Sequence, residues 1–179
     1  MSDLVTVILA AGKGTRMKSK LPKVLHKAAG KSMVQHVIDA AKAAGAKRNI
    51  VVTGFGGDMV REAIGDQAEF AQQKEQLGTG HAVMQTADLL KDETGTVMVL
   101  CGDTPLLTGD LLKKLFDSHV EAKAKATVLT AIMPDATGYG RIIRTADGSV
   151  QKIVEHKDAT EEERQVKEVN SGIYCFDAK

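Results

Sequence analysis

Two glycines and two cations follow the first apolar run of the chain, and together they could bind an anion. Residues 5–11 read VTVILAA and predict a buried strand, and Gly12, Lys13, Gly14 and Arg16 come directly after it. Glycine lets a ligand approach the main chain, and backbone N–H groups beside cations suit a polyphosphate. The same residues also fit a tight turn from strand to helix whose glycines serve packing alone. The loop by itself leaves both interpretations open.

This loop differs from the two best-known phosphate-binding loops. The dinucleotide fingerprint G-x-G-x-x-G requires a third glycine at the position of Met17. The Walker pattern G-x-x-x-x-G-K-[ST] fails because a single residue separates Gly12 from Gly14. An NAD-type dinucleotide domain is disfavoured further, since no ribose-binding acid stands out after the second strand.

A carboxylate follows the most continuous apolar run. Residues 96–101 predict a buried strand, and Gly102 and Asp103 come next. The position after a buried parallel strand is where α/β sheets bind ligands and metals. A hard oxygen ligand with phosphate co-ligands suits Mg²⁺, so Asp103 is the metal candidate. The alternative for Asp103 is an N-cap or Asx turn before Pro105.

A second glycine loop precedes another predicted helix. Gly78 and Gly80 flank Thr79 just before the helical pattern that starts at Ala82. Backbone N–H donors at such a helix start point outward, which favours ligand binding. An ordinary capped loop is the alternative.

Lys23 is a candidate partner of the first loop. Pro22 fixes the backbone before it, so we expect Lys23 beside the end of the first strand, facing the same space as Arg16. A solvated lysine, the usual fate of this residue type, is the alternative.

The elements that must position these residues alternate between strand and helix. Apolar runs predict strands at 5–10, 49–53, 69–72, 96–101 and 126–132, and 3.6-residue periodicity predicts helices at 33–41, 57–64, 82–87 and 109–120. This alternation predicts an α/β, Rossmann-like fold with a mostly parallel sheet and helices on both faces. Parallel strand ends would bring the loops to one edge, where one extended ligand could lie.

Beyond residue 132 the pattern changes. Residues 138–144 and 149–155 flank the turn Asp147-Gly148, which predicts a β-hairpin, and we expect it to form a flap over the site. The charged stretch from Glu161 to Arg164 predicts a solvated helix, and residues 170–172 precede a last strand at 173–176.

The composition of the chain limits the classes of protein to which it can belong. A chain of 179 residues suits one domain, or one domain and a small appendage, and its formal net charge of +1 gives no support to a nucleic-acid or membrane partner. Cys101 and Cys175 form no CxxC pair, which indicates a reducing compartment and argues against zinc. The N-terminus lacks a signal-peptide pattern, and no apolar run could span a bilayer. We expect a cytoplasmic protein.

The motifs together carry a family resemblance. They are LAAGKGTRM at 9–17, LPK at 21–23, QLGTG at 76–80, GD at 102–103, GYG at 138–140, IVEHK at 153–157 and NSG at 170–172. In this order, over essentially the whole chain, they resemble the uridyltransferase domain of the bacterial bifunctional N-acetylglucosamine-1-phosphate uridyltransferase and glucosamine-1-phosphate acetyltransferase. The first loop alone would indicate only the wider sugar-nucleotide pyrophosphorylase superfamily. The GYG and IVEHK motifs narrow the resemblance to the uridyltransferase domain.

The resemblance implies a reaction. A uridylyl group passes from UTP to N-acetylglucosamine 1-phosphate, giving pyrophosphate and UDP-N-acetylglucosamine, a precursor of peptidoglycan and lipopolysaccharide, with Mg²⁺ as cofactor. Such chemistry needs positioning and charge neutralisation more than a protein nucleophile, so no covalent intermediate is expected. Two alternatives are a nucleotidyltransferase for another sugar or base, and a module that binds UDP-sugar without catalysis.

The resemblance also implies roles for particular residues. The catalytic set is Arg16, Lys23 and Asp103, with Asp103 on the metal. The nucleotide is held by Leu9, Ala10, Ala11, Gly12, Gln73, Gly78, Thr79, Cys101 and Gly102, and the sugar by Gly140, Glu155 and Asn170. The family varies at the position of Cys101, so the resemblance implies a role for the backbone of this residue and none for its side chain.

The family's proteins are longer than this chain. The resemblance implies that residues 1–179 are the N-terminal uridyltransferase domain, that this domain continues beyond Lys179, and that an asparagine from the missing part is a second metal ligand. The acetyltransferase β-helix, through which the full-length family forms homotrimers, is also absent, so the oligomeric state does not carry across.

Overall fold

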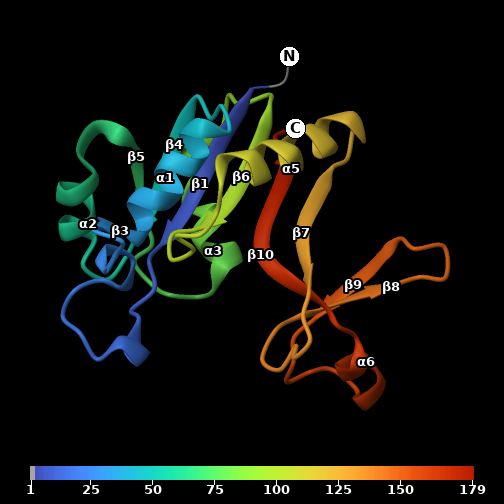
Figure 1. Cartoon of the computed structure of the whole chain (residues 1–179). Helices are drawn as coiled ribbons and strands as arrows, with labels where there is room; N and C mark the ends of the chain where they lie inside the picture. The colour runs from blue at the N-terminus through green and yellow to red at the C-terminus, as the bar shows by residue number, and fades with distance from the viewer. Residues whose placement is uncertain (1–2) are drawn as a thin grey trace. The chain divides into compact units, whose positions relative to one another are not determined.

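The computed structural model describes residues 3–179, which form two compact units. The first unit contains residues 3–127 and 174–179, and the second contains residues 128–173. Figure 1 traces the chain from the first strand, in blue, to the last, in red.

The first unit is built on a mostly parallel sheet. Its parallel strands are β1 (Leu4–Ala10), β4 (Arg48–Thr53), β5 (Glu69–Gln72) and β6 (Thr96–Cys101), in the spatial order β5-β4-β1-β6. The end of β10 (Glu168–Asp177) pairs antiparallel with β6 through residues 174–177. The predicted α/β fold with a mostly parallel sheet is therefore confirmed.

The register brings the ends of the parallel strands together. Ala10 of β1 pairs with Thr53 of β4, and Thr53 pairs with Gln72 of β5. On the other side of β1, Leu9 pairs with Cys101 of β6. Because these residues end their strands, the loops that follow start from one edge of the sheet.

Helices cover both faces of this sheet. They are α1 (Met33–Ala43), α2 (Gly57–Ile64), α3 (Thr79–Met84), α4 (Ala87–Leu90) and α5 (Gly109–Glu121). Alternate strand residues such as Val5, Val7 and Val99 pack with α3 and α4, while α1 packs on β1 and α5 (Figure 1). Thr108 begins α5 as its N-cap, accepting a hydrogen bond from the Leu111 backbone. No helix among residues 3–179 has the length and apolar character to cross a membrane.

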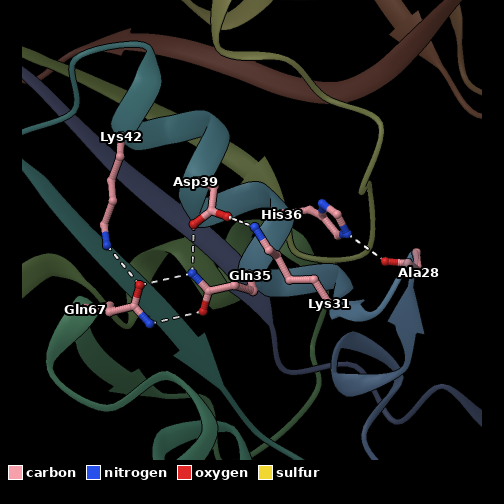
Figure 2. Close-up of polar contacts among 7 residues, drawn as sticks. All are labelled: Ala28, Lys31, Gln35, His36, Asp39, Lys42 and Gln67. Atoms are coloured by element: carbon pink, nitrogen blue, oxygen red, sulfur yellow. Dashed lines mark hydrogen bonds and ion pairs between the residues drawn. The ribbon is translucent and has the colours of Figure 1, made fainter.

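A short hairpin that the sequence analysis did not predict follows Lys23. Strands β2 (Lys27–Ala28) and β3 (Lys31–Ser32) pair antiparallel and lead into α1. The Met33 N–H donates to the His26 carbonyl at 3.0 Å, which closes the loop at its base. His36 of α1 is half-buried, and its Nε2 donates to the Ala28 carbonyl at 2.8 Å (Figure 2).

A polar network fastens this hairpin and the short 3₁₀ turn η3 (Gly65–Gln67) to α1 (Figure 2). Asp39 on α1 accepts from Lys31 of the hairpin and, at 2.9 Å, from Gln35. The Gln35 and Gln67 amides exchange two hydrogen bonds of 3.0 and 3.1 Å. Burial raises the pKa of Asp39, but the bonds from Lys31 and Gln35 outweigh it and hold that pKa below its usual value. The segment that follows Lys23 is thus anchored to a core helix.

The second unit contains the predicted hairpin. Strands β8 (Arg141–Arg144) and β9 (Val150–Val154) pair antiparallel, and α6 (Glu161–Gln165) begins with a capping box made by Thr160 and Glu163. The hairpin is confirmed, whereas its role as a flap stays a prediction.

The strands that connect the two units differ from expectation. Strand β7 (Ala126–Ile132) pairs with β10 instead of extending the parallel sheet. Strand β10 begins at Glu168, so Asn170, expected just before the last strand, lies within it.

Candidate active site

A cavity of about 530 Å³ opens where β1 and β6 end. Its lining residues are Leu9, Ala10, Gly12, Gly14, Thr15, Arg16, Met17, Lys23, Val24, Thr79, Cys101 and Asp103. The structure therefore brings Arg16, Lys23 and Asp103 to one cavity, as the sequence analysis expected.

Close packing of the first loop places Lys23 at this cavity. Gly14 has a φ of +57°, in the left-handed region that favours glycine. A Cβ atom added to Gly14 would lie 2.8 Å from the Lys23 Cβ. Glycine thus allows the loop to lie directly against the Lys23 side chain, which the short 3₁₀ turn η2 (Lys23–Leu25) presents.

Asp103 is fixed by the turn that ends β6. The Gly102 N–H donates to the Leu9 carbonyl at 2.9 Å, and an added Gly102 Cβ would lie 2.9 Å from the same oxygen. The Asp103 Oδ2 then accepts from the Lys23 Nζ at 2.6 Å. The two side chains are 33% and 36% exposed, so this is a partly solvated ion pair between residues far apart in the chain.

The charges of the cavity are only partly neutralised. Lys23 and Asp103 neutralise each other, whereas Arg16 has no ion-pair partner among residues 3–179. A cavity with an unpaired guanidinium beside a glycine loop suits a phosphate-bearing ligand.

Cys101 lies in the same cavity as a protonated thiol. Burial, assisted by the Asp103 carboxylate, raises the pKa of Cys101, and the nearby Lys23 only partly opposes this shift. Because the thiolate is the nucleophilic form, Cys101 is unsuited to covalent catalysis near neutral pH.

A second cavity of about 250 Å³ adjoins the first and shares Leu9, Gly12 and Thr79 with it. Its other lining residues are Ala11, Gln73, Gln76, Gly78 and Ala82. Gly78 has a φ of +102°, a conformation that L residues rarely adopt, and it turns the loop into α3.

Gln73 is the buried polar group of this second cavity. It is 3% exposed, and its Nε2 donates to the Gly78 carbonyl at 3.1 Å and to the His81 Nδ1 at 3.0 Å. These bonds orient the amide, and none of residues 3–179 donates to its Oε1. Gln73 therefore offers a fixed acceptor to a ligand in the cavity.

Some residues of the loops differ from expectation. Lys13, expected to supply charge beside Arg16, lines a separate cavity. Ala11 lines the second cavity as a buried residue, whereas Gly102 is buried and its N–H already donates to the Leu9 carbonyl. Thr15 and Val24 also line the main cavity, but sequence reasoning did not select them as site residues. The signal that could have identified them is that they are adjacent in sequence to Arg16 and Lys23.

The residues expected on the sugar side gather in the second unit. An added Gly140 Cβ would lie 3.3 Å from the Glu155 Oε1 and 3.6 Å from the Asn170 Cβ. The Asn170 N–H also donates to the Gly140 carbonyl at 2.9 Å. Three separated motifs therefore form one cluster within that unit.

Comparison with known proteins assigns the family. The sequence profile described as nucleotidyl transferase matches residues 5–179. The chain belongs to the nucleotidyl transferase family. It is 58% identical over 171 residues to the bifunctional protein GlmU of Geobacillus thermodenitrificans, covering 96% of this chain and 37% of that protein. It is 56% identical over 179 residues to the bifunctional protein GlmU of Bacillus cereus, covering 100% and 39%. The chain thus spans under two fifths of the length of these curated relatives.

This nucleotidyl transferase offers one carboxylate to a metal ion at its main cavity. Among the described residues no three His, Cys, Asp or Glu side chains are grouped as metal ligands. Mg²⁺ commonly keeps several waters and binds one or two carboxylates together with substrate phosphates. Asp103 fits an ion that arrives with a nucleotide.

A buried arginine supports the Gly140 cluster of the nucleotidyl transferase. Arg141 is 2% exposed, and its guanidinium donates to the carbonyls of Val166, Tyr139 and Arg164. These bonds join β8 to the segment around α6.

Replacing Arg141 with methionine should destabilise the second unit by about 1–3 kcal/mol, because the buried carbonyls lose their donors. Denaturant unfolding, with hydrogen exchange to assign the loss to residues 128–173, would measure it. The exposed Arg144→Met, which also removes an arginine from β8, is the control. Equal, small effects of both substitutions would contradict a supporting role for Arg141.

Proposed function

We propose that this domain transfers a uridylyl group from UTP to N-acetyl-α-D-glucosamine 1-phosphate, giving UDP-N-acetylglucosamine and pyrophosphate. The observation that carries the proposal is the main cavity, where Arg16, Lys23 and Asp103 lie beside a glycine loop. The similarity of the chain to GlmU proteins supports the choice of reaction. The product would serve as a precursor of peptidoglycan and lipopolysaccharide.

The charged residues would act on the phosphates. Arg16 and Lys23 would offset the charge of the triphosphate and of the attacking sugar phosphate, where negative charge gathers in the transition state. Leu9, Ala10 and Gly12 would surround the nucleotide, because they line the cavity with Cys101. The transfer needs positioning and charge neutralisation more than a protein nucleophile, so we expect direct attack by the sugar phosphate without a covalent enzyme intermediate.

Asp103 would hold Mg²⁺, which when bound would neutralise charge on the phosphates. Asp103 forms an ion pair with Lys23 in the ligand-free protein. We therefore expect Lys23 to turn toward the phosphates when a nucleotide and its metal are present.

The second cavity would select the base. Uracil presents an N3–H donor, whereas the N3 of cytosine is an acceptor. The fixed Oε1 of Gln73 matches the donor, and Gly78 and Thr79 would lie against the base.

Replacing Gln73 with leucine should lower the preference for UTP over CTP by about tenfold, the effect of one lost hydrogen bond in a buried site. Initial rates with each nucleotide would measure the preference. Gln76→Leu changes an exposed residue of the same cavity and should leave the preference unchanged. An unaltered ratio of the two rates in Gln73→Leu would exclude this role.

Gly140, Glu155 and Asn170 would bind the sugar. The Glu155 carboxylate can accept hydrogen bonds from sugar hydroxyls, and the absence of a side chain at Gly140 leaves room beside it. We place the reaction in the cytoplasm, since Cys101 and Cys175 form neither a CxxC pair nor a disulfide-rich pattern in the sequence.

The decisive test follows pyrophosphate release from UTP, N-acetylglucosamine 1-phosphate and Mg²⁺, using this chain and a version extended to the length of its relatives. Release by the folded, extended protein is expected. If the extended protein releases no pyrophosphate, the proposal is overturned. If it releases pyrophosphate only with a different sugar phosphate, the assignment of the substrate changes. Saturable UDP-N-acetylglucosamine binding by both, without turnover by either, would identify a binding module instead.

A further inference from the structure

The loop between β1 and η2 is unusually basic. Within residues 13–23 it carries five cations and no carboxylate, although the whole chain has a net charge of only +1. The cations are Lys13, Arg16, Lys18, Lys20 and Lys23. The positive charge is therefore concentrated in one short segment.

The structure divides these cations between two cavities. Arg16 and Lys23 line the main cavity of about 530 Å³. Lys13, Lys18 and Lys20 line a separate cavity of about 390 Å³, together with Ser19 and Phe55. Gly14 and Thr15 line both cavities, so the two are neighbours with a common wall.

The turn η1 (Thr15–Met17) produces this division. Gly14 before it and Lys18 after it have left-handed backbones, with φ of +57° and +48°. The Met17 N–H donates to the Gly14 carbonyl at 2.8 Å, which holds the turn closed. The tight turn separates Arg16 from the lysines that flank it.

The three lysines of the second basic cavity have no carboxylate to neutralise them. None of Lys13, Lys18 and Lys20 forms an ion pair within residues 3–179, and all three are exposed. Lys23 of the same segment, by contrast, pairs with Asp103. Like charges around one cavity repel, and a compact polyanion between them would relieve that repulsion.

We propose that Lys13, Lys18 and Lys20 form a second anion site that receives inorganic pyrophosphate as it leaves the main cavity. This inference rests on the proposed function, whose leaving group is pyrophosphate. The shared wall of Gly14 and Thr15 gives the product a short path between the cavities. The lysines also attract pyrophosphate from solution, which promotes its rebinding for the reverse reaction.

The chemistry of the cavity favours a small polyanion. Its lining residues include three exposed lysines around a volume of about 390 Å³, which suits a compact anion. A nucleic acid or an anionic membrane would need a broader basic surface, and the remainder of the chain has a net negative charge.

The test titrates inorganic pyrophosphate into the protein by calorimetry, without divalent cations and with UDP-N-acetylglucosamine saturating the main cavity. The double variant Lys18→Gln, Lys20→Gln should bind pyrophosphate about tenfold more weakly than the wild type, because two charge-assisted contacts are lost. The matched control, Lys113→Gln with Lys114→Gln, removes the same charge from the exposed surface of α5 and should bind as the wild type does. Arginine at positions 18 and 20 should restore binding.

A kinetic measurement complements the titration. Product inhibition by pyrophosphate should weaken about tenfold in the Lys18, Lys20 variant, while KM for UTP stays unchanged. Equal pyrophosphate affinity in both double variants would overturn the inference. RNA or anionic vesicles that bind through the same lysines more tightly than pyrophosphate does would also overturn it. Failure of the proposed function would instead abolish pyrophosphate release. The comparison of the two double variants, repeated without UDP-N-acetylglucosamine, would still report on the lysines, because it needs neither turnover nor that ligand.

Discussion

Replacing Lys23 with alanine should lower kcat by about 10²- to 10³-fold, the usual cost of removing one group that stabilises transition-state charge. Lys23 lines the main cavity, and its ammonium lies 2.6 Å from the carboxylate of Asp103, the metal candidate. KM for both substrates should change little, because the charge matters most where negative charge gathers during transfer. Steady-state kinetics with pyrophosphate detection would measure both constants.

The design of this variant limits structural side effects. Alanine keeps the Cβ atom against which Gly14 packs, so the loop should hold its shape. Lys23→Arg keeps the charge and should retain part of the activity, whereas Lys113→Ala on the surface of α5 should retain all of it. Equal losses in substrate binding and in kcat would argue against a role in the chemical step.

Replacing Asp103 with asparagine should raise the Mg²⁺ concentration for half-maximal rate by about 10- to 100-fold, the range in which changes at metal sites alter affinity. Asp103 is the single carboxylate among the described residues that line the main cavity, so the neutral amide would leave the ion mainly its phosphate and water ligands. Rates across a Mg²⁺ titration at fixed UTP would show the shift. Binding of Mn²⁺ in the presence of UTP, followed by electron paramagnetic resonance, gives a readout that needs no turnover.

The control for this substitution is Asp117→Asn, which changes an exposed carboxylate on α5. Neither variant should lose much stability, because partly exposed ion pairs contribute about 1 kcal/mol or less. A Mg²⁺ titration of Asp103→Asn that superimposes on that of the wild type would exclude Asp103 as a metal ligand.

Local sequence patterns were sufficient for most secondary structure. Apolar runs located β4 and β6, and the glycine and N-cap signals located the turns between the elements. The same reasoning placed the candidate loops at one sheet edge, since parallel strands that alternate with helices must end on the same side. Family motifs then suggested a reaction that the loops alone did not specify.

Local patterns were insufficient where strands pair across long distances. The pairing of β10 with β6 and β7, and the short hairpin β2–β3, depend on which surfaces remain to be covered once the parallel sheet has formed. Hydrophobic periodicity identifies a strand but carries no information about its neighbour. For the same reason Asn170 was expected outside the strand that contains it.

The sequence by itself determined that a basic glycine loop, a second glycine loop and Asp103 lie at the ends of buried strands. Only the tertiary structure decided that Lys23 pairs with Asp103 across 80 positions of the chain, that Gln73 is buried with one acceptor free, and that Lys13 lies apart from Arg16. Residue types and spacing set backbone preference and charge. The direction of a side chain depends on close contacts such as that between Gly14 and Lys23, which form only when distant segments pack together.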